Sequence, residues 1–279
     1  MSKKITAEDL TAFQTYLIED EKSNATLEKY MRDIRHFILY NAGRPIDKLL
    51  LLEYKSTLEK EYAITSANSM LAALNAFLRF MGWHELCIKQ FRVQKPVYCP
   101  EEKELTKAEY IRLVETARRT GNEKLYFILQ TICSTGIRVS ELQHITVESL
   151  KSGKAIVQCK GKTRVIFLVR DLQKKLLGYT RQQGIKSGPI FITRHKKPVN
   201  RSCIWRDMKA LCKQAHVAPG KVFPHNLRHL FARIFYQQEK DISKLADVLG
   251  HSSINTTRIY IISTGKEHCR YMESMQLII

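Results

Sequence analysis

The stretch FRVQKPVYCPEEKELT, residues 91–106, is the feature that most constrains the fold of this chain. It contains Pro96, Pro100 and a cluster of charged residues, and no helical or strand period continues across it. Because proline lacks a backbone N–H and disfavours helix in the residue before it, a regular element is expected to end here. The sequence therefore predicts two domains, residues 1–92 and 105–279, joined by a linker at 93–104.

Three segments of the first domain repeat apolar residues with the period of a helix, at residues 6–21, 23–43 and 64–83. The second begins with the cap-type residues Ser-Asn and closes at a glycine, as helices commonly do. The apolar side chains expected to face the core are Leu10, Phe13, Leu17, Ile18, Leu27, Tyr30, Met31, Ile34, Phe37, Ile38, Leu71, Leu74, Phe77, Leu78 and Met81. The first domain is thus predicted to be a small helical bundle.

The second domain is predicted to be mostly helical with a small antiparallel sheet, which makes the fold class mainly α (α+β). The stretch KAIVQCKGKTRVIFLV, residues 154–169, has apolar flanks around Lys160-Gly161-Lys162 and is typical of a β-hairpin. Apolar spacing predicts the helices, at residues 106–121, 123–136, 202–216, 225–239 and 241–250.

Positive charge is concentrated in the second domain. The whole chain has a formal net charge of +19, from 46 Lys and Arg against 27 Asp and Glu. Residues 1–99 carry 14 basic and 12 acidic side chains, whereas residues 100–279 carry 32 and 15. Such an excess suits a polyanion such as DNA, because neutralising phosphates releases condensed counterions.

Several other classes of protein are disfavoured. The N-terminus MSKKITAEDL has no hydrophobic signal region, and no apolar run approaches the ~20 residues of a membrane span. No long basic amphipathic helix or lipidation motif indicates a membrane partner. The seven cysteines are scattered without a CxxC pair, which favours reduced thiols and disfavours zinc. We expect a cytoplasmic protein without a cofactor or metal.

The stretch STGIRVSELQHI, residues 134–145, places Arg138 and Glu141 three residues apart at the start of a helix. Such a pair is usually a surface ion pair of little energetic value. The preceding Thr-Gly, however, ends one helix and begins another. Arg138 would then lie in a first turn, where it could face a ligand while Glu141 holds it.

The predicted hairpin and the helix after Pro224 supply further cationic groups. Lys160 lies in the hairpin turn, where a lysine is usually only solvated, although a hairpin could deliver its ammonium group as a proton donor. In FPHNLRHLFARIF, His225 and Arg228 are three residues apart and both are expected to face outward from the first turn. The positive end of the helix dipole lies there and favours an anion, although helix capping is the ordinary alternative.

The stretch LGHSSINTTRIY, residues 249–260, ends a short helix and leads to a tyrosine. Leu245, Val248 and Leu249 form an apolar stripe, and Gly250 is expected to end the helix. His251 follows at once, and Tyr260 comes after a polar turn. A tyrosine near a C-terminus is usually half-buried packing.

Taken together, these residue types match the requirements of nucleophilic attack on a phosphodiester. Arginines neutralise the charge that builds on the non-bridging oxygens, and a proton donor protonates the leaving 5′ oxygen. A tyrosine hydroxyl has a pKa of about 10, so it needs a base and nearby cations to act as the nucleophile. No carboxylate cluster suitable for Mg²⁺ is evident, which disfavours a two-metal nuclease.

The motifs closely resemble those of the tyrosine recombinases, or phage integrase family. TGIRVSEL resembles the first arginine box of that family, HNLRH its HxxR box, and LGHSSINTTRIY its box with the second histidine and the tyrosine. NATLEKYMRDIRHF resembles the SAM-like core-binding domain, in which TLxxYxxDI is typical. The resemblance covers nearly the whole chain.

The resemblance implies a role for each matching residue. Tyr260 would attack the scissile phosphate to form a 3′-phosphotyrosine, and Arg138 and Arg228 would hold the phosphate oxygens. Lys160 would be the general acid, with Lys162 as the other possibility because the turn is a residue shorter than in many relatives. His225 would serve as acid/base, His251 would hydrogen-bond the phosphate, and Glu141 would orient the site. The possible DNA contacts are Thr26, Tyr30, Lys162, Arg164 and Arg258.

The resemblance also implies partners and architecture. Residues 1–92 would be the core-binding domain and 105–279 the catalytic domain, without an arm-binding domain, as in Xer-like enzymes. The enzyme would work as a homotetramer on two double-stranded DNA sites, with a related recombinase or an accessory protein possible. The apolar end MESMQLII would dock into a neighbouring protomer. Asn75 replaces a basic residue that relatives often carry, which would weaken the DNA contact of the first domain.

Two alternatives stay open at the level of sequence. A type IB topoisomerase-like enzyme would use the same chemistry as a monomer to relax DNA. A non-catalytic DNA-binding regulator would use HNLRHLFARIF as a recognition helix and would leave the set of polar residues unexplained. Integration, excision and chromosome-dimer resolution are not distinguished.

Overall fold

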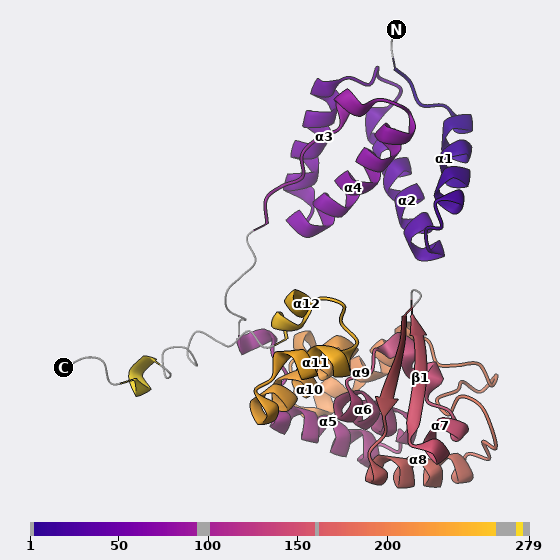
Figure 1. The fold of residues 1–279 in the computed structure, drawn as a ribbon, viewed down its shortest axis with the longest axis vertical. Coiled ribbons are helices and arrows are strands. Elements are labelled where there is room, and N and C mark those ends of the chain that lie inside the picture. Colours follow the sequence, from indigo (N-terminus) through magenta and orange to yellow (C-terminus); the bar gives the residue numbers. More distant parts are fainter. Residues whose placement is uncertain (1–2, 94–100, 160–161, 261–271, 276–279) are drawn as a thin grey trace. The chain divides into compact units, whose positions relative to one another are not determined.

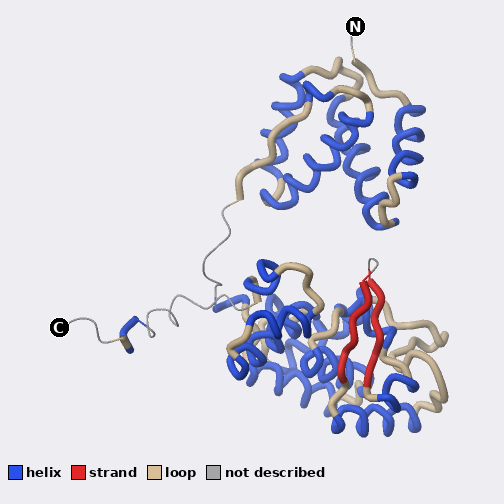
Figure 2. Tube along the Cα trace, in the orientation of Figure 1, coloured by secondary structure: helices blue, strands red, loops and turns tan. Residues whose placement is uncertain are grey.

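The computed structural model divides the chain into two compact units, Met1–Lys95 and Pro96–Ile279 (Figure 1). It describes residues 3–93, 101–159, 162–260 and 272–275. Helices dominate both units, and the described strands form one antiparallel pair in the second unit (Figure 2). Within the described residues, no helix is both long enough and apolar enough to span a membrane.

The first unit is a helical bundle, as predicted. Its helices are α1 (Ala7–Glu19), α2 (Asn24–Asn41), α3 (Lys48–Glu61), α4 (Ile64–Phe80) and the short η1 (His84–Leu86). Thr6 and Asp9 form a capping box at the start of α1, and Ser23 and Asp47 cap α2 and α3. Helix α3 was missed at the sequence level because the run of four leucines at 49–52 masks its period. The fold buries the second and third of these leucines, together with Tyr54 and Leu58.

Most of the predicted core of the first unit is confirmed, with two differences. Phe13, Phe37 and Phe77 are fully buried, whereas Ile18 is 58% exposed because it lies beside the buried stripe rather than within it. The second difference concerns Asn75, a position that the sequence analysis considered only for its effect on DNA contact. Asn75 is buried, and its amide donates to Ile88 O at 2.8 Å and accepts from Ile88 N at 2.9 Å. It therefore fixes the chain after η1 and does not face a ligand.

The second unit packs helices around an apolar core and sets a hairpin beside them. Its elements are η2 (Glu101–Lys103), α5 (Lys107–Arg119), α6 (Glu123–Thr135), η3 (Val139–His144), α7 (Val147–Ser152), β1 (Lys154–Cys159), β2 (Lys162–Phe167), α8 (Arg170–Gln182), α9 (Arg201–Ala215), η4 (Pro219–Lys221), α10 (Pro224–Glu239), α11 (Ile242–Leu249) and α12 (Ile254–Arg258). The predicted helices and the hairpin are confirmed. Helices α7 and α8 were not predicted, and α12 replaces the predicted polar turn.

The hairpin has one inward and one outward face. Its register pairs Val157 with Arg164 and Ile156 with Val165. Ala155, Val157 and Ile166 join the core, whereas Ile156, Val165 and Phe167 are exposed. This alternation follows from the two-residue period of a strand, and it places Arg164 on the face that is turned toward the protein.

Candidate active site

Arg138 and Glu141 are joined at the junction between α6 and η3. Gly136 ends α6 in the left-handed conformation, with φ of 64°, and its missing side chain leaves room for the ring of Phe231. Arg138 is the N-cap of η3, and its backbone N–H donates to Glu141 Oε2 at 2.9 Å. Its Nη1 also donates to Glu141 Oε1 at 2.9 Å. Glu141 therefore fixes both the backbone and the side chain of Arg138.

Glu141 has a second cationic partner that the sequence did not reveal. Arg164, on β2, donates from Nη2 to Glu141 Oε2 at 2.5 Å. Burial raises the pKa of the Glu141 carboxyl, but the hydrogen bonds from Arg138 and the charges of both arginines outweigh it and hold that pKa below its usual value. Glu141 is 3% exposed, so this is a buried carboxylate shared by two guanidinium groups. The pattern that could have identified Arg164 is its inward register position opposite Val157.

The prediction that Arg228 faces outward from α10 was wrong. Arg228 is 2% exposed, and its guanidinium donates to Gly136 O and to Leu249 O, the latter at 2.7 Å. These carbonyls end α6 and α11, where the helix dipoles present partial negative charge. Two helix C-termini thus compensate the cost of burying this cation. Burial and the charge of Arg138 lower the pKa of Arg228 to about 10, so it stays protonated at neutral pH.

His251 lies between Arg228 and α12. Its Nε2 is 3.0 Å from Arg228 Nη2, and its Nδ1 is 2.9 Å from Thr257 Oγ1. Because a guanidinium can only donate, Nε2 must accept, and the proton of the neutral imidazole is therefore on Nδ1. In this arrangement His251 supports Arg228, and a phosphate hydrogen bond from Nε2 would require that nitrogen to be protonated.

Tyr260 is buried among imidazole rings. It is 7% exposed and packs on the cluster of Ala232, Leu245 and Leu249. Its ring centroid is 5.4 Å from that of His225 and 5.3 Å from that of His251. The third imidazole belongs to His229, which stacks on Tyr260 with 4.2 Å between centroids and 27° between planes.

His229 was missed by the sequence analysis, although it lies one helical turn after His225 and therefore on the same face of α10. Burial, followed by the nearby charges of His225, Arg233 and Arg228, lowers the pKa of His229 to about 4. Burial and the charges of Arg228, Arg138 and Arg164 similarly lower the pKa of His251 to about 4. The pKa of His225 is lowered by desolvation and by neighbouring arginines. All three imidazoles are neutral at pH 7 and can accept protons.

Two hollows meet at Arg138. One, of about 410 Å³, is lined by Arg138, His225, Arg228 and Arg201, with Trp205 at its side. The other, of about 770 Å³, is lined by residues of η3, the hairpin and the end of α11, among them Arg138, Glu141, Arg164 and His251. Arg138 thus borders both spaces, and the two arginine motifs and both motif histidines are brought together around them.

The lysines of the hairpin are described only in part. Lys160 lies outside the described residues, and Lys162 is the first residue of β2, paired with Cys159. The second half of the tail motif MESMQLII is also outside them, and the four described residues, 272–275, are exposed. Among the residues described, no cluster of three or more His, Cys, Asp or Glu could hold a metal ion.

The other expected DNA contacts are dispersed. Arg258 is exposed on α12, and Arg164 is 12% exposed, with its guanidinium engaged by protein acceptors. Thr26 bonds through Oγ1 to Ser23 Oγ at 2.9 Å, and Tyr30 packs against the core of the first unit.

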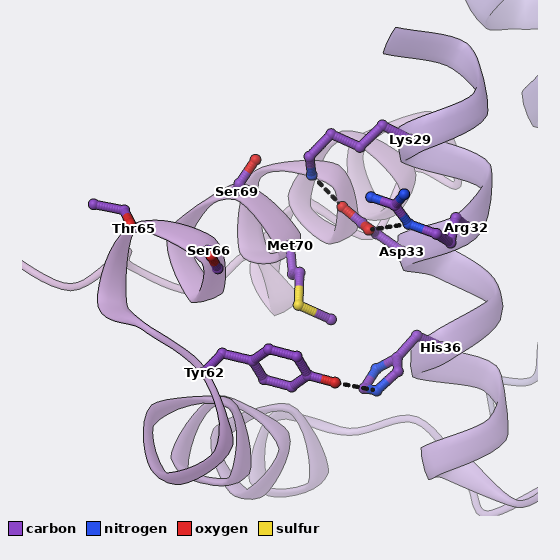
Figure 3. A pocket seen from close by; sticks show the side chains of 9 residues that line it. All are labelled: Lys29, Arg32, Asp33, His36, Tyr62, Thr65, Ser66, Ser69 and Met70. Carbon is purple, nitrogen blue, oxygen red and sulfur yellow. Dashed lines mark hydrogen bonds and ion pairs between the residues drawn. The ribbon is translucent and has the colours of Figure 1, made fainter. Parts of the chain in front are cut away.

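A hollow of about 540 Å³ lies further along α2, facing α4 (Figure 3). The residues that line it include Lys29, Arg32, Asp33, His36, Tyr62 and Ser69.

Comparison with known families and proteins bears on both units. Residues 103–267 match the phage integrase family, and residues 10–85 match the phage integrase N-terminal SAM-like domain. The tyrosine recombinase XerA of Pyrococcus furiosus is 29% identical over 99% of this chain and 96% of its own length. The tyrosine recombinase XerD of Halalkalibacterium halodurans is 28% identical over 87% of this chain and 88% of its own length.

Solved structures show the same architecture. A crystal structure of XerA recombinase covers 98% of both chains at 26% identity, with a TM-score of 0.54. A dimer of lambda integrase residues 75–356 bound to a COC′ core site covers 95% of this chain and 97% of its own, with a TM-score of 0.76. At 19% identity, the second likeness concerns the fold alone.

Proposed function

This chain is a member of the phage integrase family, a tyrosine recombinase of the Xer type, and on that premise we propose that Tyr260 is the nucleophile with which it cleaves and rejoins DNA at specific sites. The observation that carries the proposal is the setting of Tyr260, whose ring lies among three neutral imidazoles and 5.9 Å from the Arg228 guanidinium carbon. A base and a cation at these positions are what a tyrosine hydroxyl needs to attack phosphorus.

The proposed reaction is a transesterification. The Tyr260 oxygen bonds to the scissile phosphorus while the bond from phosphorus to the 5′ oxygen breaks, which leaves a 3′-phosphotyrosine and a 5′ hydroxyl. Neutral His225 is placed to take the phenolic proton. The covalent intermediate conserves the energy of the broken bond, so a 5′ hydroxyl can reverse the attack on the same or another strand without ATP.

Arg138 and Arg228 would stabilise the transition state. Both line the hollow that also holds His225, and both are positioned by acceptors of the protein before any DNA binds. Preorganised donors of this kind are worth about 10²–10³ in rate each, because they need no rearrangement when charge develops. A bound phosphate would also favour protonation of His251, which could then donate from Nε2.

The leaving 5′ oxygen needs a proton, and a lysine of the hairpin is the proposed donor. In the sequence, Lys160 directly follows the last residue of β1, and Lys162 begins β2. A hairpin lysine is proposed because described residues of β1 and β2, among them Val157 and Arg164, line the hollow that Arg138 borders. The choice between them stays a prediction.

We propose that the enzyme assembles on double-stranded DNA as a homotetramer that joins two sites; a related recombinase or an accessory protein is the alternative partner. Residues 1–92 would act as the core-binding domain, 93–104 as the linker and 105–279 as the catalytic domain with a docking tail. Support comes from a related fold, since lambda integrase has been solved as a tetramer bound to a Holliday junction. A topoisomerase-like activity and a non-catalytic regulator are not favoured, because both family matches lead to recombinases.

The test begins without knowledge of the DNA site. Nicked genomic DNA fragments from the source organism are incubated with the protein and boiled in SDS, and DNA that remains attached to protein is recovered and sequenced. We expect an adduct with the wild type and none with Tyr260→Phe, although both bind DNA equally. Equal amounts of adduct from both proteins would exclude Tyr260 as the nucleophile.

A further inference from the structure

Arg164 connects three parts of the catalytic unit through one guanidinium group. It projects from the inward face of β2 and contacts Glu141 Oε2 at 2.5 Å. Its Nη1 donates to Leu249 O and to Val248 O, the latter at 3.2 Å. The hairpin is thereby bonded both to the segment that carries Arg138 and to the helix end that precedes His251.

The backbone at Gly250 is adapted to this arginine. Gly250 ends α11 with φ of 63°, a conformation that favours glycine. A Cβ at this position would clash with Arg164 Cδ and lie 3.3 Å from its Nε. The side chain of Arg164 therefore passes over the one residue that separates Leu249 from His251, and close packing at this point depends on the absence of a side chain.

The hairpin needs such an anchor to hold a defined position. An isolated two-stranded sheet is marginally stable, and the outward face of this one is unpaired and exposed at Ile156 and Phe167. Arg164 lies two residues after Lys162, which begins β2. A charged hydrogen bond to a buried carboxylate fixes geometry more firmly than apolar contact alone.

We propose that Arg164 is a positioning residue that holds the hairpin so that its lysine can protonate the leaving 5′ oxygen. The inference rests on the proposed function, because it assumes a lysine acid. It does not assign Arg164 to the phosphate itself. Arg138 has its own two bonds to Glu141, so the phosphate-binding arginine would keep its position if Arg164 were lost.

The proposal predicts a chemical rescue. When the 5′ oxygen of the cleaved phosphate is replaced by sulfur, the departing thiolate needs no proton, and a misplaced acid no longer limits the reaction. The probe is a synthetic duplex with the sequence recovered from the Tyr260 adduct and one 5′-bridging phosphorothiolate at the cleaved position. Single-turnover cleavage is compared with that of the all-oxygen duplex.

For Arg164→Ala we expect cleavage of the oxygen duplex to fall about 100-fold or more, which is the range of a lost general acid, and cleavage of the sulfur duplex to stay within about fivefold of the wild type. Arg164→Lys retains the charge but not the fork of donors, so an intermediate loss and the same rescue are expected. The exposed Arg181→Ala, on α8, is the matched arginine control. Near-wild-type cleavage of the sulfur duplex also shows that a variant is folded.

Equal losses on both duplexes, for both variants of Arg164, would overturn the proposal and assign the residue to stability or to the phosphate site. Lys160→Ala and Lys162→Ala separate this failure from that of the premise. If neither lysine variant is rescued by sulfur while the wild type still forms the Tyr260 adduct, the lysine acid is wrong and the role of Arg164 is withdrawn with it. Rescue of a lysine variant without rescue of Arg164→Ala would exclude the positioning role alone.

Discussion

Each unit of the molecule buries a carboxylate between two cations, and the two arrangements differ in what they connect. In the first unit, Asp33 is 5% exposed and pairs with Lys29 and Arg32 of its own helix, as Figure 3 shows. In the second, Glu141 is 3% exposed and pairs with Arg138 at its own helix start and with Arg164 from a strand 23 residues away.

The difference lies in the exposure of the partners. The side chain of Arg32 is 73% exposed and that of Lys29 is 33% exposed, so both can turn to water if Asp33 is neutralised. Arg164 is 12% exposed and lies among other guanidinium groups, so it cannot turn to water in the same way if Glu141 is neutralised. An ion pair within one helix acts only on that helix, whereas an ion pair between two elements fixes their relative position. The second kind is found where the proposed chemistry needs several elements to stay in register.

Glu141→Gln is the change with the largest expected effect. It leaves Arg164 without its buried counterion, which costs about 3–5 kcal/mol in the free energy of unfolding. We also expect adduct formation to fall by about 10² or more, because Arg138 loses its orientation. Asp33→Asn is the matched control and should cost about 1 kcal/mol or less without slowing cleavage. Denaturation by urea measures the free energy of unfolding, and single-turnover assays measure cleavage. Similar results for the two variants would contradict the difference drawn between the two carboxylates.

Asn75→Leu tests whether a neutral buried group in the first unit acts on stability alone. It leaves the N–H and C=O of Ile88 without their side-chain partner, at a cost of about 1–3 kcal/mol. Asn68 makes a similar pair of bonds to Phe91 but is less buried, so Asn68→Leu should cost less. Thermal unfolding of the full chain gives the ranking. A weakened DNA affinity at unchanged stability would contradict a purely structural role for Asn75.

The histidines around Tyr260 should make the stability of the second unit depend on pH. Since the pKa values of His229 and His251 are about 4 when folded and about 6.5 when unfolded, the unfolded chain binds more protons between these values. Stability is therefore complete above pH 6.5 and is lost as the pH falls toward 4, by at most ~1.4 kcal/mol per pH unit for each histidine. His229→Asn should flatten this dependence, and the exposed His195→Asn should leave it unchanged.

The smallest expected effect concerns the salt dependence of DNA binding. Arg201 is exposed and borders the hollow of Arg138 and His225. If it contacts a phosphate, Arg201→Gln should reduce the slope of log affinity against log salt by about 0.9. Lys29→Gln should change it less, because that ammonium is already paired with Asp33. Affinities between 50 and 200 mM salt, a range over which such contacts are readily seen, distinguish the two.

Sequence was a good guide where a signal is local. Helical periods, the hairpin and the glycine ends of α6 and α11 follow from neighbouring residues, and the structure confirms them. Prediction failed where a fully apolar run hides the helical period, as in α3. It also failed where residues beside the buried face of a helix were counted as part of the core. Val248, for example, was expected in the core and is 37% exposed.

The sequence by itself determined the two units, the excess of charge in the second, and the set of polar residues proposed for catalysis. Only the tertiary structure decided how that set is held. It buried Arg228 on two helix ends, stacked His229 on Tyr260 and joined Arg164 to Glu141. The physical reason is that the environment of a charge depends on groups from distant parts of the chain. Periodicity records which face of an element is apolar, but it does not record which carbonyl or carboxylate another element brings to that face.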